Sequence, residues 1–139
     1  MIPSTPALEA ENPIICVLIV DDNPQVRQEL RQLLQLTDGI EVVGEASDGK
    51  GAILQAEQLH PDVVIMDLEM PILDGLQATT QIKQRGLASR VVILSVHSEP
   101  EDLDHAMQAG ADAFIQKGSP YCTLIQSIKP SKTKKGEIK

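Results

Sequence analysis

Apolar residues gather along this chain in short segments separated by stretches of helical periodicity. Five segments rich in Ile, Leu, Val and Ala have the length of strands, and they span residues 14–20, 40–46, 63–66, 91–94 and 113–116. The first is apolar at every position, as expected of a strand that is covered on both faces. The stretches after each segment carry apolar residues three or four positions apart, which is the period of an amphipathic helix.

Turn residues mark the boundaries between these patterns. Pro24 follows Asn23 where the first helix is expected, and proline is favoured at the first position of a helix. The helix predicted from Pro100 would turn Leu103, Ala106 and Met107 toward a core. Five strands alternating with five helices through short loops predict an α/β fold, a doubly wound five-stranded parallel sheet with helices on both faces.

Polar residues stand at the ends of four of the five predicted strands, namely Asp21 with Asp22, Asp67, Ser95 and Lys117. Ligands of doubly wound sheets bind beyond the carboxyl ends of the strands, so these side chains are expected to meet. Three carboxylates repel one another, and a divalent cation offsets that cost. Oxygen ligands suit Mg²⁺, which neutralises a phosphoryl group facing a carboxylate nucleophile. The set therefore predicts aspartyl-phosphate chemistry, with Lys117 paired to the nucleophile at rest and Ser95 as a hydroxyl donor.

The motifs around these positions resemble the receiver domain of bacterial response regulators over residues 14–128. They are Val20-Asp21-Asp22-Asn23, residues 65–71 with Asp74-Gly75, Leu94-Ser95, and residues 109–117. The resemblance implies a flavodoxin-like (βα)5 fold with strand order 2-1-3-4-5. It also implies that Asp67 accepts a phosphoryl group from a sensor histidine kinase and switches the conformation of the domain to control an output.

The resemblance assigns a metal site to four of these residues. Asp22 and Asp67 would bind Mg²⁺ directly, together with the main-chain carbonyl of Glu69, and Asp21 would act through a water molecule. Mg²⁺ is the one cofactor that this implies.

The resemblance also assigns residues to phosphoryl binding and switching. Ser95 and Phe114 would form the switch pair, and Lys117 would bind the phosphoryl group. Glu69 and His97 stand two positions beyond Asp67 and Ser95, where they would modulate phosphoryl lifetime. For His97, simple solvation in a loop is the alternative.

Charge divides the chain unevenly. The net charge is −8, although residues 129–139 hold five lysines and one glutamate, so the preceding part is strongly acidic. An acidic domain repels the phosphate backbone, and DNA binding by this domain itself is not expected. The predicted division is a flexible N-terminal arm at 1–12, a receiver domain at 13–128, and a basic tail or start of a linker at 129–139.

Two further segments, 42–49 and 117–120, resemble regulators that carry a C-terminal helix-turn-helix DNA-binding domain. The residues after Ile128 are too few for three helices, so we expect a receiver fragment of a longer transcription regulator, with a stand-alone domain as the alternative. DNA would be bound only through an output domain absent from this chain. A homodimer is compatible with such a regulator.

Cysteine use and hydropathy indicate the compartment. Cys16 and Cys122 are far apart and form no CxxC motif, which favours reduced thiols in the cytoplasm. No apolar run has the length that a bilayer requires, so no membrane partner is expected.

Two other functions remain as alternatives to the switch. A Mg²⁺-dependent phosphohydrolase resembling the haloacid dehalogenases would place a second aspartate where Glu69 stands. A receiver-like interaction module that is never phosphorylated would be expected to lack part of the acidic set, and no member is missing. A flavin or nucleotide binder is disfavoured because no Gly-rich phosphate loop follows the first strand. The chain is therefore predicted to be a signalling protein and not an enzyme.

Overall fold

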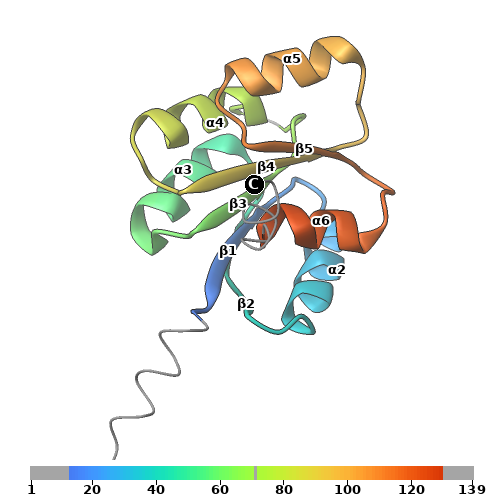
Figure 1. Cartoon of the computed structure of the whole chain (residues 1–139). Coiled ribbons are helices and arrows are strands. Elements are labelled where there is room, and N and C mark those ends of the chain that lie inside the picture. Colours follow the sequence, from blue (N-terminus) through green and yellow to red (C-terminus); the bar gives the residue numbers. More distant parts are fainter. Residues whose placement is uncertain (1–12, 71, 130–139) are drawn as a thin grey trace, which may run out of the picture.

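The computed structural model describes residues 13–70 and 72–129. Within them, five strands alternate with five helices (Figure 1). The elements are β1 Ile15–Val20, α2 Pro24–Gln35, β2 Ile40–Ala46, α3 Gly49–Leu59, β3 Val63–Met66, α4 Gly75–Gln84, β4 Arg90–Ser95, α5 Pro100–Gln108, β5 Ala113–Gln116 and α6 Tyr121–Ile128. The predicted arm at 1–12, Pro71 and the tail beyond Lys129 lie outside the described residues.

The five strands form one parallel sheet in the order β2-β1-β3-β4-β5. This order confirms the predicted doubly wound, flavodoxin-like fold. Because β1 pairs with both β2 and β3, the direction of winding reverses at β1. The crevice that such a reversal opens lies at the carboxyl ends of β1 and β3.

Alternation along the strands gives the sheet two buried faces. Val17 and Ile19 of β1 belong to one apolar cluster, whereas Leu18 and Val20 belong to the other. Helices α2 and α6 cover the first face, and α3, α4 and α5 cover the second (Figure 1). Both clusters are aliphatic for the most part, because the chain has one phenylalanine and one tyrosine.

Side chains cap the helices that begin beside the carboxyl ends of the strands. Asn23 before α2, Asp48 before α3 and Asp74 before α4 each accept a hydrogen bond from a main-chain N–H two or three residues ahead, at 2.9, 2.7 and 2.9 Å. Pro24 occupies the first turn of α2, as predicted. These caps fix where the loops between strands and helices end.

Helix α5 differs from the sequence prediction. Ala106 is fully buried, but Leu103 and Met107 are 44% and 49% exposed. The helix meets the sheet along a narrow stripe near the edge strand β5, so residues on either side of Ala106 stay in solvent. None of the helices in the described residues combines the length and the apolar character needed to traverse a lipid bilayer.

Gly49 and Gly51 give opposite predictions within one turn of α3. A Cβ at Gly49 would lie 2.2 Å from the carbonyl oxygen of Leu73, to which the Gly49 N–H donates at 2.9 Å. A Cβ at Gly51 would meet its nearest atom, in the Asp48 carboxylate, at 3.4 Å. We expect Gly49→Ala to destabilise the domain by about 2 kcal/mol, because α3 must move away from the loop before α4.

Gly51→Ala serves as the matched control. Alanine favours the helix over glycine by about 1 kcal/mol, so this variant should be neutral or more stable. Urea unfolding followed by circular dichroism measures both changes. Equal unfolding midpoints for the two variants would contradict the close packing at Gly49.

Candidate functional site

The carboxyl ends of β1 and β3 bring three aspartates together. Val20 pairs with Met66, and the Asp67 N–H donates to the Val20 carbonyl at 3.0 Å. One carboxylate oxygen from each of Asp21, Asp22 and Asp67 lies within 4.8 Å of the others. Asp21 and Asp67 are buried, whereas Asp22 is exposed. The three carboxylates that the sequence placed at strand ends therefore form one cluster.

Lys117 reaches this cluster from the end of β5. Its Nζ donates to Oδ2 of Asp21 at 2.9 Å and lies 3.6 Å from Oδ1 of Asp67. The sequence interpretation paired Lys117 with Asp67 at rest, whereas the hydrogen bond is to Asp21 and Asp67 is the more distant partner. Burial lowers the pKa of Lys117, but the hydrogen bond to Asp21 and the charge of Asp67 outweigh it, so the pKa is raised.

Asp67 is the carboxylate whose ionisation costs most. Burial raises the pKa of Asp67 from 3.8 to about 6, and the charge of Asp21 adds to the effect. Lys117 opposes the shift, Asp22 reinforces it, and a main-chain hydrogen bond from Leu68 opposes it. A crowded set of hard oxygen donors with an excess of negative charge fits Mg²⁺, which prefers carboxylate and water ligands.

The start of α4 packs directly on the main chain of Asp67. A Cβ at Gly75 would lie 2.1 Å from the carbonyl oxygen of Asp67, and the Gly75 N–H donates to the Leu68 carbonyl at 2.8 Å. Asp74 caps the same helix through the N–H of Gln77. The Asp74-Gly75 pair therefore has a structural role, since only a glycine allows α4 to press against the loop that follows β3.

Ser95 and Phe114 lie on neighbouring strands, β4 and β5. Ser95 is 1% exposed, and its Oγ accepts a hydrogen bond from the His97 N–H at 3.0 Å. Phe114 pairs with Ile93 and packs against the cluster on the face covered by α3, α4 and α5. Because Ile93 and Ser95 are two residues apart on one strand, Ser95 points to the same face as Phe114. The predicted switch pair thus consists of diagonal neighbours.

The side chains of Glu69 and His97 contact each other across the loops that follow β3 and β4. Nε2 of His97 lies 3.0 Å from Oε2 of Glu69, and both side chains are exposed. The sequence named each residue separately and did not predict their contact. The pair borders a hollow of about 360 Å³, lined by Leu68, Glu69, Met70, Asp74, Leu76, His97 and Asp102.

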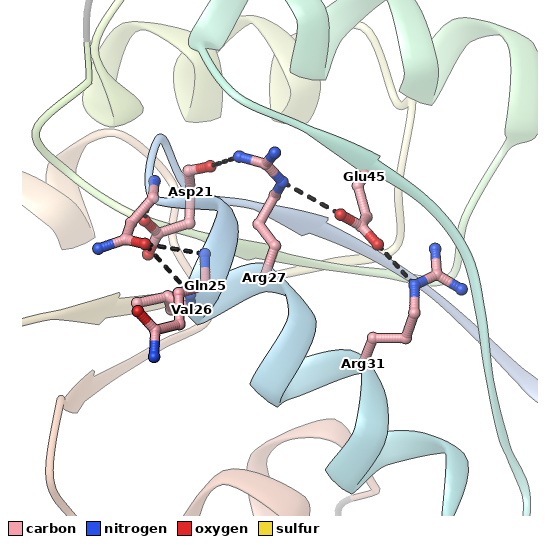
Figure 2. Close-up of polar contacts among 7 residues, drawn as sticks. Asp21, Gln25, Val26, Arg27, Arg31 and Glu45 are labelled. Atoms are coloured by element: carbon pink, nitrogen blue, oxygen red, sulfur yellow. Dashed lines mark hydrogen bonds and ion pairs between the residues drawn. The ribbon is translucent and has the colours of Figure 1, made fainter.

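Arg27 and Glu45 lie beside the site and were not predicted from the sequence. Arg27 of α2 donates to the main-chain carbonyl of Asp21, and its guanidinium also contacts Glu45 of β2 (Figure 2). A charged residue on an amphipathic helix is ordinarily solvated, so the sequence offered no sign of these contacts beyond the helical spacing of Arg27 and Arg31.

Comparison with known proteins identifies the family. Residues 17–129 match the model of the response regulator receiver domain. Over 112 residues the chain is 39% identical to the nitrate/nitrite response regulator protein NarL of Escherichia coli (strain K12), a match that covers 81% of this chain and 52% of that protein. The chain belongs to the response regulator receiver domain family, the receivers of two-component systems. It spans about half the length of this relative.

Solved structures agree with this assignment. The signal receiver domain of the response regulator NarL from Mycobacterium tuberculosis has a TM-score of 0.78 and 31% identity, over 85% of this chain and 98% of that one. A DNA-binding response regulator of the LuxR family from Staphylococcus aureus has a TM-score of 0.78 and 27% identity, over 84% of this chain and 97% of that one. These similarities confirm the fold and the resemblance to regulators of transcription.

The raised pKa of Asp67 predicts how stability depends on pH. The folded-state pKa of about 6 lies above the ordinary value of 3.8, so folding favours the protonated carboxyl. That stabilisation is complete below pH 3.8 and is lost as the pH rises through about 6. Without divalent cations, Asp67→Asn should therefore be more stable than the parent by about 3 kcal/mol at neutral pH, and the difference should vanish at low pH.

Urea unfolding in acidic and in neutral buffer measures this difference. Asp104→Asn, at an exposed position of α5, is the matched control and should change stability at neither pH. A stabilisation by Asp67→Asn that is the same at both pH values would contradict the assignment of the strained carboxylate to Asp67.

Proposed function

We propose that the domain is a phosphorylation-operated switch in which Asp67 accepts a phosphoryl group from a phosphohistidine of a sensor histidine kinase. The observation that carries the proposal is the buried carboxylate of Asp67, gathered with Asp21, Asp22 and Lys117 at the point where the strand order reverses. Membership of the receiver family supports it.

The chemistry is a transfer between two nucleophiles. An Asp67 carboxylate oxygen forms a bond to phosphorus while the bond from phosphorus to the kinase imidazole nitrogen breaks, and the imidazole leaves. With a pKa of about 6, Asp67 is mainly ionised at neutral pH and ready to attack. Lys117 lies 3.6 Å from the Asp67 carboxylate, close enough to pair with an oxygen of the transferred group.

The acidic cluster supports a Mg²⁺ site. Asp22, Asp67 and the main-chain carbonyl of Glu69 would hold the ion directly, and Asp21 through a water molecule. When bound, Mg²⁺ neutralises charge on the phosphoryl oxygens and aligns them with the nucleophile. The residues of this chain do the rest, because Lys117 orients Asp21 and the loop after β3 holds Asp67.

Ser95 and Phe114 would convert phosphorylation into a change of surface. The Ser95 hydroxyl turns toward the phosphoryl oxygens, and Phe114 rotates inward into the volume that Ser95 leaves. Phe114 is only partly buried, so it can move further toward the core. The surface formed by α5, β5 and α6 would then differ between the two states.

Glu69 and His97 would set how long the phosphoryl group survives. We propose that their side-chain contact lies across the approach to Asp67 and limits the access of an attacking water molecule to the phosphorylated residue. The contact depends on both residues, because Glu69 lies in the loop after β3 and His97 lies in the loop after β4.

The output is proposed to be transcription, executed by a DNA-binding domain outside this chain. The similarity to a LuxR-family regulator and to a NarL protein of about twice the matched length supports this. The regulator is further proposed to form a homodimer. The receiver domain itself would not bind DNA. The free thiols of Cys16 and Cys122 are consistent with a cytoplasmic domain. The domain would act as a switch and not as an enzyme.

Asp67 should be the residue that becomes phosphorylated. We expect incubation with phosphoramidate and Mg²⁺ to add one labile phosphoryl group, because the activated phosphorus meets an ionised carboxylate in an acidic, cation-binding cluster. Intact-mass spectrometry detects the adduct. It should be absent in Asp67→Asn and present in the control Asp104→Asn.

Two outcomes would count against this function. An adduct that persists in Asp67→Asn would place the acceptor elsewhere. A parent that takes up no phosphoryl group would support the interaction module, and one that catalytically hydrolyses phosphate esters would support the phosphohydrolase.

Ser95→Ala should separate binding from switching. Beryllofluoride, a phosphoryl analogue, should still bind the variant because Asp67, Mg²⁺ and Lys117 remain. The amide chemical-shift changes that it causes across residues 96–128 should shrink by about half or more, because the hydroxyl that couples the site to Phe114 is gone. Two-dimensional amide NMR measures both effects. Full-size shifts in the variant would assign the coupling to another residue.

A further inference from the structure

Arg27 lies between two acceptors that belong to different parts of the fold. Its Nη1 donates to the main-chain oxygen of Asp21 at 2.6 Å, and its Nε donates to Oε1 of Glu45 at 3.1 Å (Figure 2). The second carboxylate oxygen of Glu45 accepts from Nε of Arg31 at 2.5 Å. The Arg27 side chain is 19% exposed, which is low for an arginine.

Glu45 holds the guanidinium of Arg27 in place. Arg27 and Arg31 are one turn apart on α2 and face β2, so a single carboxylate meets both. Burial raises the pKa of Glu45, but hydrogen bonds from Arg31 and Arg27 outweigh it and hold the pKa below its ordinary value. Glu45 is therefore ionised at neutral pH, and its charged hydrogen bonds fix the plane of each guanidinium.

The hydrogen bond from Arg27 completes the fixation of the Asp21 main chain. The Asp21 N–H already donates to the Ala46 carbonyl at 3.1 Å, and Ala46 is the neighbour of Glu45 in β2. Strand β2 thus holds Asp21 twice, directly at the N–H and through Arg27 at the carbonyl.

Fixing the Asp21 carbonyl also fixes the residue that follows. The peptide unit is planar, so an anchored Asp21 oxygen orients the N–H and the Cα of Asp22. In the part of the chain that the structure describes, no hydrogen bond holds the exposed Asp22 carboxylate. The position of this carboxylate therefore depends on its main chain.

We propose that Arg27, held by Glu45, is a positioning residue for the acidic cluster, and that it preorganises the Asp21-Asp22 peptide for Mg²⁺. The inference rests on the proposed function, because it concerns the same metal site. A loop that is already ordered does not lose conformational freedom when the ion binds, so affinity rises. Edge strand β2, which supplies no ligand, becomes part of the support of the site.

Arg27→Lys tests this role. Lysine keeps the positive charge, but one ammonium cannot reproduce the planar fork that spans Asp21 and Glu45. We expect the Mg²⁺ affinity to fall about tenfold, the lower end of the range for residues that support metal ligands. Arg31→Lys is the matched control, because it weakens a contact with the same Glu45 and leaves the Asp21 carbonyl bonded. Its Mg²⁺ affinity should change by less than about twofold.

Titration calorimetry with MgCl₂ gives the affinities, and melting curves without Mg²⁺ report the stability of each variant. The amide nitrogen shift of Asp22 in the Mg²⁺-free protein is a second readout, since it senses the hydrogen bond to the preceding carbonyl. It should move in Arg27→Lys and in Glu45→Gln, and stay in Arg31→Lys. Glu45→Gln also replaces Arg27→Lys if the latter does not fold.

The outcomes separate this inference from the proposed function. If the parent binds Mg²⁺ and the Arg27→Lys variant binds it equally well, the positioning role is overturned. Equal losses in Arg27→Lys and Arg31→Lys overturn it too, because they would reflect general weakening of α2. If the parent does not bind Mg²⁺, the proposed metal site is wrong. If in addition the amide nitrogen shift of Asp22 is the same in Arg27→Lys and Glu45→Gln as in the parent, the positioning role is wrong as well.

Discussion

Repulsion among like charges at the ends of β1 and β3 is the constraint on which the rest of the structure depends. Three carboxylates lie within 4.8 Å of one another, and an unrestrained backbone would let them separate. Hydrogen bonds between neighbouring strand ends prevent this, from Asp21 to Ala46 and from Asp67 to Val20. The two apolar faces of the sheet provide the stability that a strained cluster needs.

Much of this arrangement could be predicted because it depends on local patterns. Short apolar segments separated by helical periodicity define the strands, and parallel strands place all their carboxyl ends at one edge. Once the strands at 14–20 and 63–66 are recognised, Asp21 and Asp67 must lie near each other whatever the details of packing. Asn23 and Pro24 similarly mark the start of α2 through their own chemistry.

Contacts set by tertiary packing could not be predicted in the same way. Arg27 and Glu45 are far apart in sequence, and their meeting depends on how α2 rotates over β2. The choice of Lys117 between Asp21 and Asp67 depends on differences of less than 1 Å between the two contacts, 2.9 and 3.6 Å. Leu103 and Met107 have helical spacing but stay exposed, because periodicity identifies an apolar stripe and not how wide a surface covers it.

The hydrogen bond between Ser95 and His97 gives the resting domain an energetic bias. A hydroxyl offers one donor and two lone pairs, and at rest a lone pair of Ser95 is engaged by the His97 N–H. Moving the Oγ of Ser95 itself toward another group either breaks this bond or carries the β4–α5 loop with it. A hydrogen bond of this kind contributes about 1 kcal/mol, so it favours the resting conformer about fivefold. In the proposed switch, this single main-chain N–H would therefore help to keep the population of active conformers low until a phosphoryl group is present.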